Sequence, residues 1–159
     1  MKQLYIKSAR KVLQHKKELE EKLNVKISVK NTDVSVEGEE TDTYFACRVL
    51  EAMDYPFLVE DALLLKDENF MFEVIPIKDH TKRHDYEVIR GRLIGKKGKT
   101  LKVLQNLSDC EIAVKDNNVA IIGPVEFFDE ARQAVISIIQ GSKQGHVYSN
   151  LERGRKRER

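Results

Sequence analysis

The chain has 159 residues, of which 41% are hydrophobic and 34% charged, and its formal net charge is +2. This is the balance of a soluble globular chain with room for one medium domain or two small ones, and it excludes long disorder, collagen-like repeats and a membrane span. Basic residues interrupt any secretory signal after Met1, and the two distant cysteines lie outside any Cys/His cluster, so we expect a cytoplasmic protein without zinc or disulfides.

The first half of the chain matches the second half when it is shifted by 85 positions. Apolar residues between positions 19 and 53 then fall on apolar residues between 104 and 138, at the spacings of strands and helices. The matched pairs include Leu19 with Leu104, Ile27 with Ile112, Val36 with Ile121 and Ala46 with Ala131. Two copies are too few for a solenoid, so the shift predicts a tandem of similar small domains.

The elements of the second copy are the clearer ones. Residues 70–77 are rich in Phe, Val and Ile and predict a strand, residues 79–85 a polar loop, and residues 86–94 a short helix. A glycine turn at 95–98 leads into a second helix over 99–107, with leucines along one face.

A hairpin and a long helix complete this copy. Residues 110–114 alternate as a half-buried strand, 116–118 carry turn residues, and 119–122 return as a strand. Pro124 suits the start of a helix whose apolar stripe ends shortly before Gly141. The predicted order is therefore β-α-α-β-β-α.

The predicted fold class is α+β, with two tandem domains, each a three-stranded sheet covered by helices on one face. Domains of this size have marginal cores, so we expect the two copies to be docked together. The predicted divisions are residues 1–66, residues 67–153 including a C-terminal helix, and a basic disordered tail at 154–159.

The segment that carries chemistry is the glycine turn Gly95-Lys96-Lys97-Gly98 between two helices. Glycines at both ends allow a phosphate backbone to approach main-chain N–H groups closely. The helix that restarts at Lys99 directs its N-terminal amides to the same place, and the lysines add positive charge. Ile94 and Leu101 would flank an apolar groove for unstacked bases.

Other interpretations of this turn are weaker. A lone GxxG occurs by chance in many proteins. The alternative to a phosphate-binding loop is a purely structural helix–helix turn with solvated lysines. Although Thr100 completes a GKT string, the first glycine of a P-loop would have to be at Leu93, which argues against a nucleotide hydrolase. No Ser/His/Asp or Cys/His set forms a recognisable motif, so we expect neither an enzyme nor a metal or cofactor site.

With this motif, residues 67–140 resemble a type I KH domain, whose signature is an aliphatic residue followed by GxxG. The resemblance implies that about four nucleotides of single-stranded RNA are clamped between the loop and the second strand, whose main-chain groups face the bases. The residues it implies for RNA binding are Arg92, Ile94, Gly95, Lys96, Lys97, Gly98, Lys99, Thr100, Leu101 and Ile112. Arg90 is a weaker candidate.

A narrower resemblance, to the Dim/Pno family of small-subunit assembly proteins, covers nearly the whole chain. It rests on the sequence segments 59–65, 70–74, 91–100 and 141–148, and on the degenerate first copy. The related Krr assembly factors match these strings less well, and the chain looks archaeal because it lacks a long N-terminal extension. The resemblance implies binding near the 3′ end of small-subunit (16S) rRNA, with no DNA or membrane partner. It also implies work beside the PIN-domain rRNA endonuclease and a link to the alpha subunit of translation initiation factor 2.

The first copy departs from the KH pattern because it has no GxxG. We expect Ile6–Arg10 in its place, where side chains would obstruct phosphate approach. Residues 1–80 hold 12 basic and 16 acidic residues, whereas residues 81–159 hold 16 basic and 10 acidic ones, which suggests that only the second half meets a polyanion. The first copy is therefore predicted to be a scaffold or protein-docking module, with residual RNA contact through Lys7, Arg10 and Lys11 as the alternative.

Two functions from different classes follow. The leading hypothesis is an RNA-binding assembly factor of the small ribosomal subunit. The second is a protein-interaction adaptor for an initiation factor or the processing nuclease. The salt dependence of binding distinguishes the two hypotheses, because RNA clamping weakens steeply with added salt and an apolar protein interface does not. General RNA binding in RNA decay is a third, weaker hypothesis.

Overall fold

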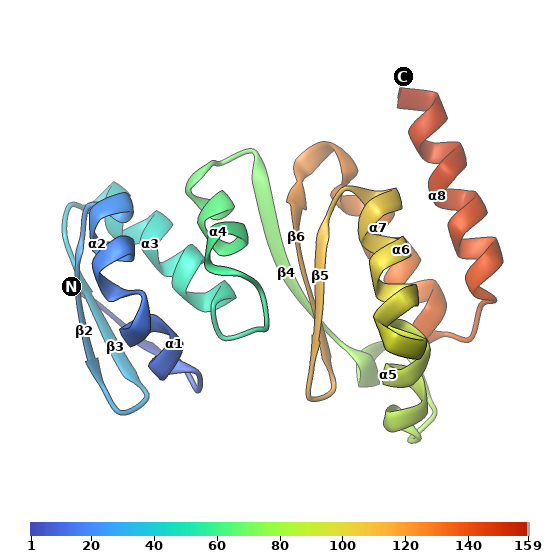
Figure 1. Cartoon of the computed structure of the whole chain (residues 1–159), viewed down its shortest axis with the longest axis horizontal. Coiled ribbons are helices and arrows are strands. Elements are labelled where there is room, and N and C mark those ends of the chain that lie inside the picture. The colour runs from blue at the N-terminus through green and yellow to red at the C-terminus, as the bar shows by residue number, and fades with distance from the viewer. Residues whose placement is uncertain (159) are drawn as a thin grey trace. The chain divides into compact units, whose positions relative to one another are not determined.

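The computed structural model describes residues 1–158, with side chains to Arg155, as two compact units: Met1 to Phe70, and Met71 onward. The first unit begins with a β-α-α-β-β-α series (Figure 1). Its elements are β1 (Lys2–Tyr5), α1 (Ala9–Gln14), α2 (Lys16–Leu23), β2 (Lys26–Lys30), β3 (Asp33–Glu37) and α3 (Glu40–Ala52). The strands pair antiparallel in the order β1-β3-β2.

Alternating strand residues and one stripe of each helix form the core of the first unit. On the central strand β3, Val34 and Val36 are fully buried while Asp33 and Glu37 are exposed, which is the period of two expected of a sheet with one covered face. Leu19 of α2 is also fully buried. The helices lie on one face of the sheet, as the sequence predicts.

Two short helical segments close the first unit. They are α4 (Val59–Ala62) and a 3-10 turn over Leu63–Lys66. The Arg48 guanidinium on α3 donates hydrogen bonds to the carbonyls of Leu65 (3.0 Å) and Phe70 (2.5 Å). These contacts attach Leu65 and Phe70 to α3, and both residues belong to the first compact unit, which ends at Phe70.

The second unit repeats the same series and adds a helix. Its elements are β4 (Phe70–Pro76), a 3-10 turn (Ile77–His80), α5 (Tyr86–Ile94), a 3-10 turn (Lys96–Gly98), α6 (Lys99–Ser108), β5 (Glu111–Lys115), β6 (Asn118–Pro124), α7 (Val125–Ile139) and α8 (Gln144–Glu158). The sheet order β4-β6-β5 corresponds to β1-β3-β2. The α+β prediction of two tandem β-α-α-β-β-α domains is confirmed.

The backbone also repeats at the offset of 85 residues found in the sequence. Asn24 and Asp109, which end α2 and α6, have φ +56° and +54°. Asn31 and Asp116, in the two hairpins, have the same pair of values. Asn and Asp tolerate the left-handed region better than other side chains, so each copy uses one at both turns.

The helix junction of the first unit lies at His15, between α1 and α2, and not at Ile6–Arg10 as the sequence suggested. Ile6–Ser8 instead connect β1 to α1, and Ala9 and Arg10 open that helix. The position was misjudged because the segment from β1 to α1 is much shorter than its counterpart in the second unit, so the offset of 85 does not hold there.

The C-terminal segment is helical where the sequence predicted a disordered tail. Val147 and Leu151 of α8 are buried in the core of the second unit. Arg155 lies over the Phe127 ring, 3.9 Å from its centroid, and pairs with Asp109. These contacts carry α8 on to Glu158, so the prediction of disorder is wrong for residues 154–158, and Arg159 lies outside the described residues.

Candidate nucleic-acid interface

Gly95 ends α5 in a conformation that only glycine adopts easily. Its N–H donates to the Gly91 carbonyl (2.8 Å), and its φ is +76° with ψ 173°. A β-carbon here would lie 2.2 Å from Thr100 Oγ1 and 2.7 Å from the Thr100 main-chain nitrogen. Both the backbone conformation and the packing against Thr100 therefore require glycine.

The rest of the loop is one 3-10 turn with two left-handed residues. Lys97 has φ +58° and Gly98 has φ +75°, and the Gly98 N–H donates to the Gly95 carbonyl (3.1 Å). Apart from Gly98 and its two chain neighbours, no heavy atom of the described residues lies within 4 Å of the position that a β-carbon on Gly98 would occupy. That side of the loop is open, so a ligand can approach the main chain there.

Positive charge surrounds the loop. Lys96, Lys97, Lys99 and Lys102 are exposed, and within residues 1–155 none of them forms an ion pair or a side-chain hydrogen bond. The ten-residue helix α6 starts directly after Gly98 and has no acidic residue in its first turn. The Lys99 N–H already donates to the Lys96 carbonyl of the 3-10 turn. The helix dipole is positive at this end and, together with the exposed lysines, favours a bound anion.

Apolar side chains flank the loop on both sides. Ile94, the last residue of α5, and Leu101, in the first turn of α6, are both half-buried. Thr100 is half-buried beneath Gly95. The exposed lysines and the open side of the loop thus lie beside half-buried apolar side chains. RNA binding by residues 94–101 stays a prediction.

The predicted base-facing residue Ile112 lies on β5, an edge strand of the sheet, and its N–H already has a partner. That N–H donates to Oε1 of Gln105 on α6 at 2.9 Å. Sequence reasoning missed Gln105. The spacing of four residues from Leu101, which places both on one face of α6, was the signal available for it.

The Arg92 side chain joins α5 to the end of α7 and to the segment before α8. Its guanidinium donates to the carbonyl of Ile138 (2.8 Å), near the end of α7, and to that of Ser142 (2.6 Å), between α7 and α8. Arg90 binds the side chain of Asn117 in the β5–β6 turn. The geometry gives Arg92 a structural role, and we leave it out of the candidate interface.

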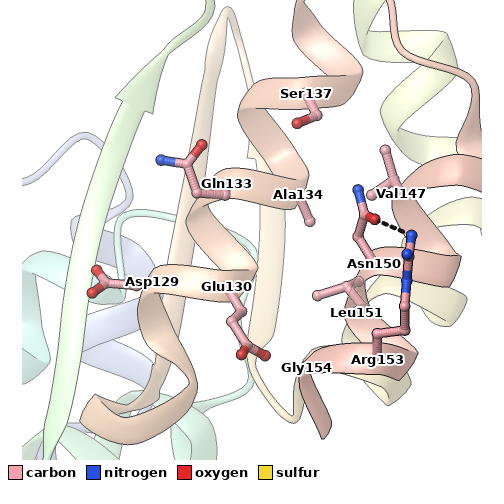
Figure 2. Close-up of a pocket in the computed structure, with 10 residues that line it drawn as sticks. All are labelled: Asp129, Glu130, Gln133, Ala134, Ser137, Val147, Asn150, Leu151, Arg153 and Gly154. Atoms are coloured by element: carbon pink, nitrogen blue, oxygen red, sulfur yellow. Dashed lines mark hydrogen bonds between the residues drawn. The ribbon is translucent and has the colours of Figure 1, made fainter. Parts of the chain in front are cut away.

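A hollow of about 420 Å³ lies between α7 and α8 (Figure 2). Its floor includes Val147 and Leu151, and Asp129 and Glu130 lie on its α7 side. The nearby Arg153 donates to Asn150 Oδ1 at 2.7 Å. Two carboxylates repel phosphate, so this hollow is a poor candidate for RNA compared with the glycine loop.

The first unit has no comparable anion site at its helix junction. His15 alone separates α1 from α2, so no glycine loop exposes main-chain amides. Lys11, one of the alternative RNA contacts, donates through Nζ to the carbonyls of Tyr55 (3.0 Å) and Phe57 (2.5 Å). Lys7 and Arg10 are exposed.

Among the remaining titratable side chains of the described residues, the candidates are ligands for a metal ion and cysteine nucleophiles. Within residues 1–155, no group of three or more His, Cys, Asp or Glu side chains is placed to hold a metal ion. Burial raises the pKa of the Cys110 thiol to about 12 and also raises the pKa of Cys47, which makes both poor nucleophiles. None of the described helices combines the length and apolar character needed to cross a membrane.

Comparison with known families gives a match over the second unit. A family model for the second KH domain of PNO1, described as a eukaryotic-type KH domain (KH-domain type I), matches residues 71–156. A KH domain-containing protein of Methanocaldococcus jannaschii is 31% identical over 150 residues, covering 89% of this chain and 66% of that protein. The pre-rRNA-processing protein PNO1 of Coccidioides immitis is 32% identical over 138 residues, covering 82% and 54%. The chain thus spans between half and two thirds of these relatives.

Solved structures from Pyrococcus horikoshii share the whole fold. The crystal structure of Dim2p matches with a TM-score of 0.85 and 27% identity, covering 96% of this chain and 98% of that one. A complex of a/eIF2alpha, aDim2p and rRNA matches with a TM-score of 0.88 and 27% identity, covering 99% and 94%. These similarities extend over both units.

Proposed function

The chain belongs to the Pno1-type KH family, and on that premise we propose that it is a non-catalytic RNA-binding factor of small-ribosomal-subunit assembly. It holds single-stranded rRNA near the 3′ end of the small-subunit (16S) rRNA through the loop Gly95–Gly98 of the second unit, and assists the maturation of that end.

The observation that carries this proposal is the loop itself. Two left-handed residues, an open side at Gly98 and the start of α6 converge on one place with unpaired lysines around it. Phosphates of a single strand suit that place, while Ile94 and Leu101 supply apolar surface for its bases.

The relatives support the RNA target. Curated relatives such as the protein of C. immitis are named for pre-rRNA processing, and one structural neighbour is a complex that contains rRNA. The second unit, which holds the loop, is also the region matched by the family model.

A binding titration tests the proposal. The probe is a short labelled single-stranded RNA that copies the 3′ end of small-subunit rRNA, with a scrambled RNA beside it, at two salt concentrations. Lys96→Asp with Lys97→Asp is expected to weaken binding by roughly a hundredfold or more, because two phosphate-neutralising charges are reversed. The melting temperature is expected to stay nearly unchanged, since both side chains are exposed.

The matched control is Lys66→Asp with Lys78→Asp. These two lysines are exposed and lie outside the loop, so the control changes the net charge equally and is expected to keep most of the affinity. Full binding by the Lys96/Lys97 variant would contradict the clamp, and its failure to fold would contradict the assignment of these residues to a surface loop. Equal binding to both RNAs would reduce the protein to a general phosphate clamp.

A second candidate function is a protein-interaction adaptor. The structural neighbour crystallised with a/eIF2alpha favours it. The partner would be the alpha subunit of translation initiation factor 2 or the PIN-domain rRNA endonuclease. We expect such binding to survive Lys96→Asp with Lys97→Asp and to depend weakly on salt, whereas RNA binding depends on both. Absence of RNA binding by the unaltered protein, with retained partner binding, would make the adaptor the leading function.

A further inference from the structure

Gln105 connects helix α6 to the open edge of the sheet. Its Oε1 accepts the Ile112 N–H at 2.9 Å, although Ile112 belongs to the edge strand β5. Ile112 is opposite Ile121 of β6 in the antiparallel ladder. Because its N–H points to α6 rather than to β6, its carbonyl points to the same open side.

The first unit contains the same connection with a different side chain. Glu20 Oε2 on α2 accepts the Ile27 N–H at 2.9 Å, and both residues are 85 positions before Gln105 and Ile112. The connection is thus part of the shared framework. The chemistry differs, because a carboxylate only accepts hydrogen bonds whereas a carboxamide also donates them.

The –NH₂ group of the Gln105 side chain is available to donate hydrogen bonds. Ile112 N–H can only donate, so it must be paired with the oxygen, and this leaves the –NH₂ group of Gln105. No side chain or carbonyl among residues 1–155 accepts from that group. Gln105 as a residue is half-buried, and it lies beside an edge whose own acceptor is the Ile112 carbonyl.

Gln105 is placed where it could contact a base of an RNA strand bound at the loop. Gln105 lies one helical turn beyond Leu101 on the same face of α6, and about 9 Å along the helix from Lys99. A strand whose phosphates are held at the loop and whose base rests on Leu101 would bring base edges to Gln105 and the β5 edge.

We infer that Gln105 is a specificity-determining residue that reads a base of the bound RNA, its oxygen tethered to Ile112 and its –NH₂ group donating to an acceptor atom on the base edge. This inference rests on the proposed RNA-binding function and adds a side-chain reader to it. The tether holds the amide in one orientation before RNA arrives, so little freedom is lost on binding.

The test substitutes Gln105→Glu, which keeps an acceptor for the Ile112 N–H, as Glu20 does in the first unit, and removes the donors. Binding is measured for an RNA copying the 3′ end of small-subunit rRNA and for a panel in which each base is changed singly. The unaltered protein is expected to prefer one base at the position that Gln105 reads. The variant is expected to lose that preference, with about a tenfold loss for the preferred RNA.

Asn106→Asp is the matched control, because the next residue of α6 is exposed and gains the same charge. It is expected to keep the preference. A Gln105→Glu variant that keeps the base preference of the unaltered protein, or an equal loss in both variants, would overturn the inference while leaving the phosphate clamp in place. Failure of the unaltered protein to bind any RNA would overturn the proposed function and the inference with it.

Discussion

Gly95 and Gly98 differ in what a side chain would meet at each position. A β-carbon at Gly95 collides with Thr100, whereas one at Gly98 points into open space and only the left-handed φ of +75° opposes it. We expect Gly95→Ala to cost about 2–4 kcal/mol of unfolding free energy and Gly98→Ala about 1–2 kcal/mol, measured by urea unfolding. Gly98→Ala is nevertheless expected to weaken RNA binding strongly, since its methyl group occupies the open side. Equal stability losses would contradict this distinction.

Cys110 predicts a pH dependence of stability. Its folded pKa of about 12, raised by burial, exceeds the unfolded value of about 8.5, so the folded state disfavours the thiolate. The stability that this thiol contributes is complete below pH about 8.5 and is lost as pH rises from there toward 12. The unfolding free energy is expected to fall more steeply between pH 8.5 and 10.5 in the unaltered protein than in Cys110→Ala. If the unfolding free energies of the two proteins fall in parallel with pH, the raised pKa of Cys110 is refuted.

At the scale of elements, Arg92 couples α5 to the end of α7 and to the segment before α8. Lysine cannot donate to both carbonyls with the same geometry, so Arg92→Lys is expected to cost about 1–3 kcal/mol of unfolding free energy. Arg92→Gln, which removes the charge, is expected to leave the salt dependence of RNA binding unchanged, because no phosphate contact is lost. Lys99→Gln, the comparison, should instead reduce the slope of log K against log salt by about 0.7. A similar reduction in Arg92→Gln would restore Arg92 as a phosphate contact.

The elements themselves followed from local patterns. The helix over 86–94 was predicted with its observed bounds, and the second-unit strands to within a few residues, because alternation and a 3.6-residue stripe report burial directly. The end of α8 was not predicted. Its polar sequence is typical of a disordered tail, whereas in the structure Arg155 contacts Phe127 and Asp109, which are distant in sequence.

Across the whole molecule, basic residues are concentrated in the second half of the sequence, which also contains the glycine loop. If one KH clamp holds about four nucleotides, the slope of log K against log salt should be about −3 for single-stranded RNA. Titrations at several salt concentrations measure it. A slope much steeper than this would mean that phosphates are also neutralised outside the loop, and would contradict the assignment of RNA binding to the second unit alone.

The sequence by itself determined the tandem α+β fold and the loop Gly95–Gly98, because periodicity, turn residues and an internal repeat are local properties that survive without coordinates. Tertiary structure decided which side chains are available to a ligand. Arg92 and Lys11 look like phosphate contacts in the sequence, yet carbonyls distant in sequence occupy them. Gln105 looks like an ordinary polar helix residue until the fold places its amide on the edge of β5. Hydrogen-bond partners far apart along the chain are set by packing, and no local pattern records them.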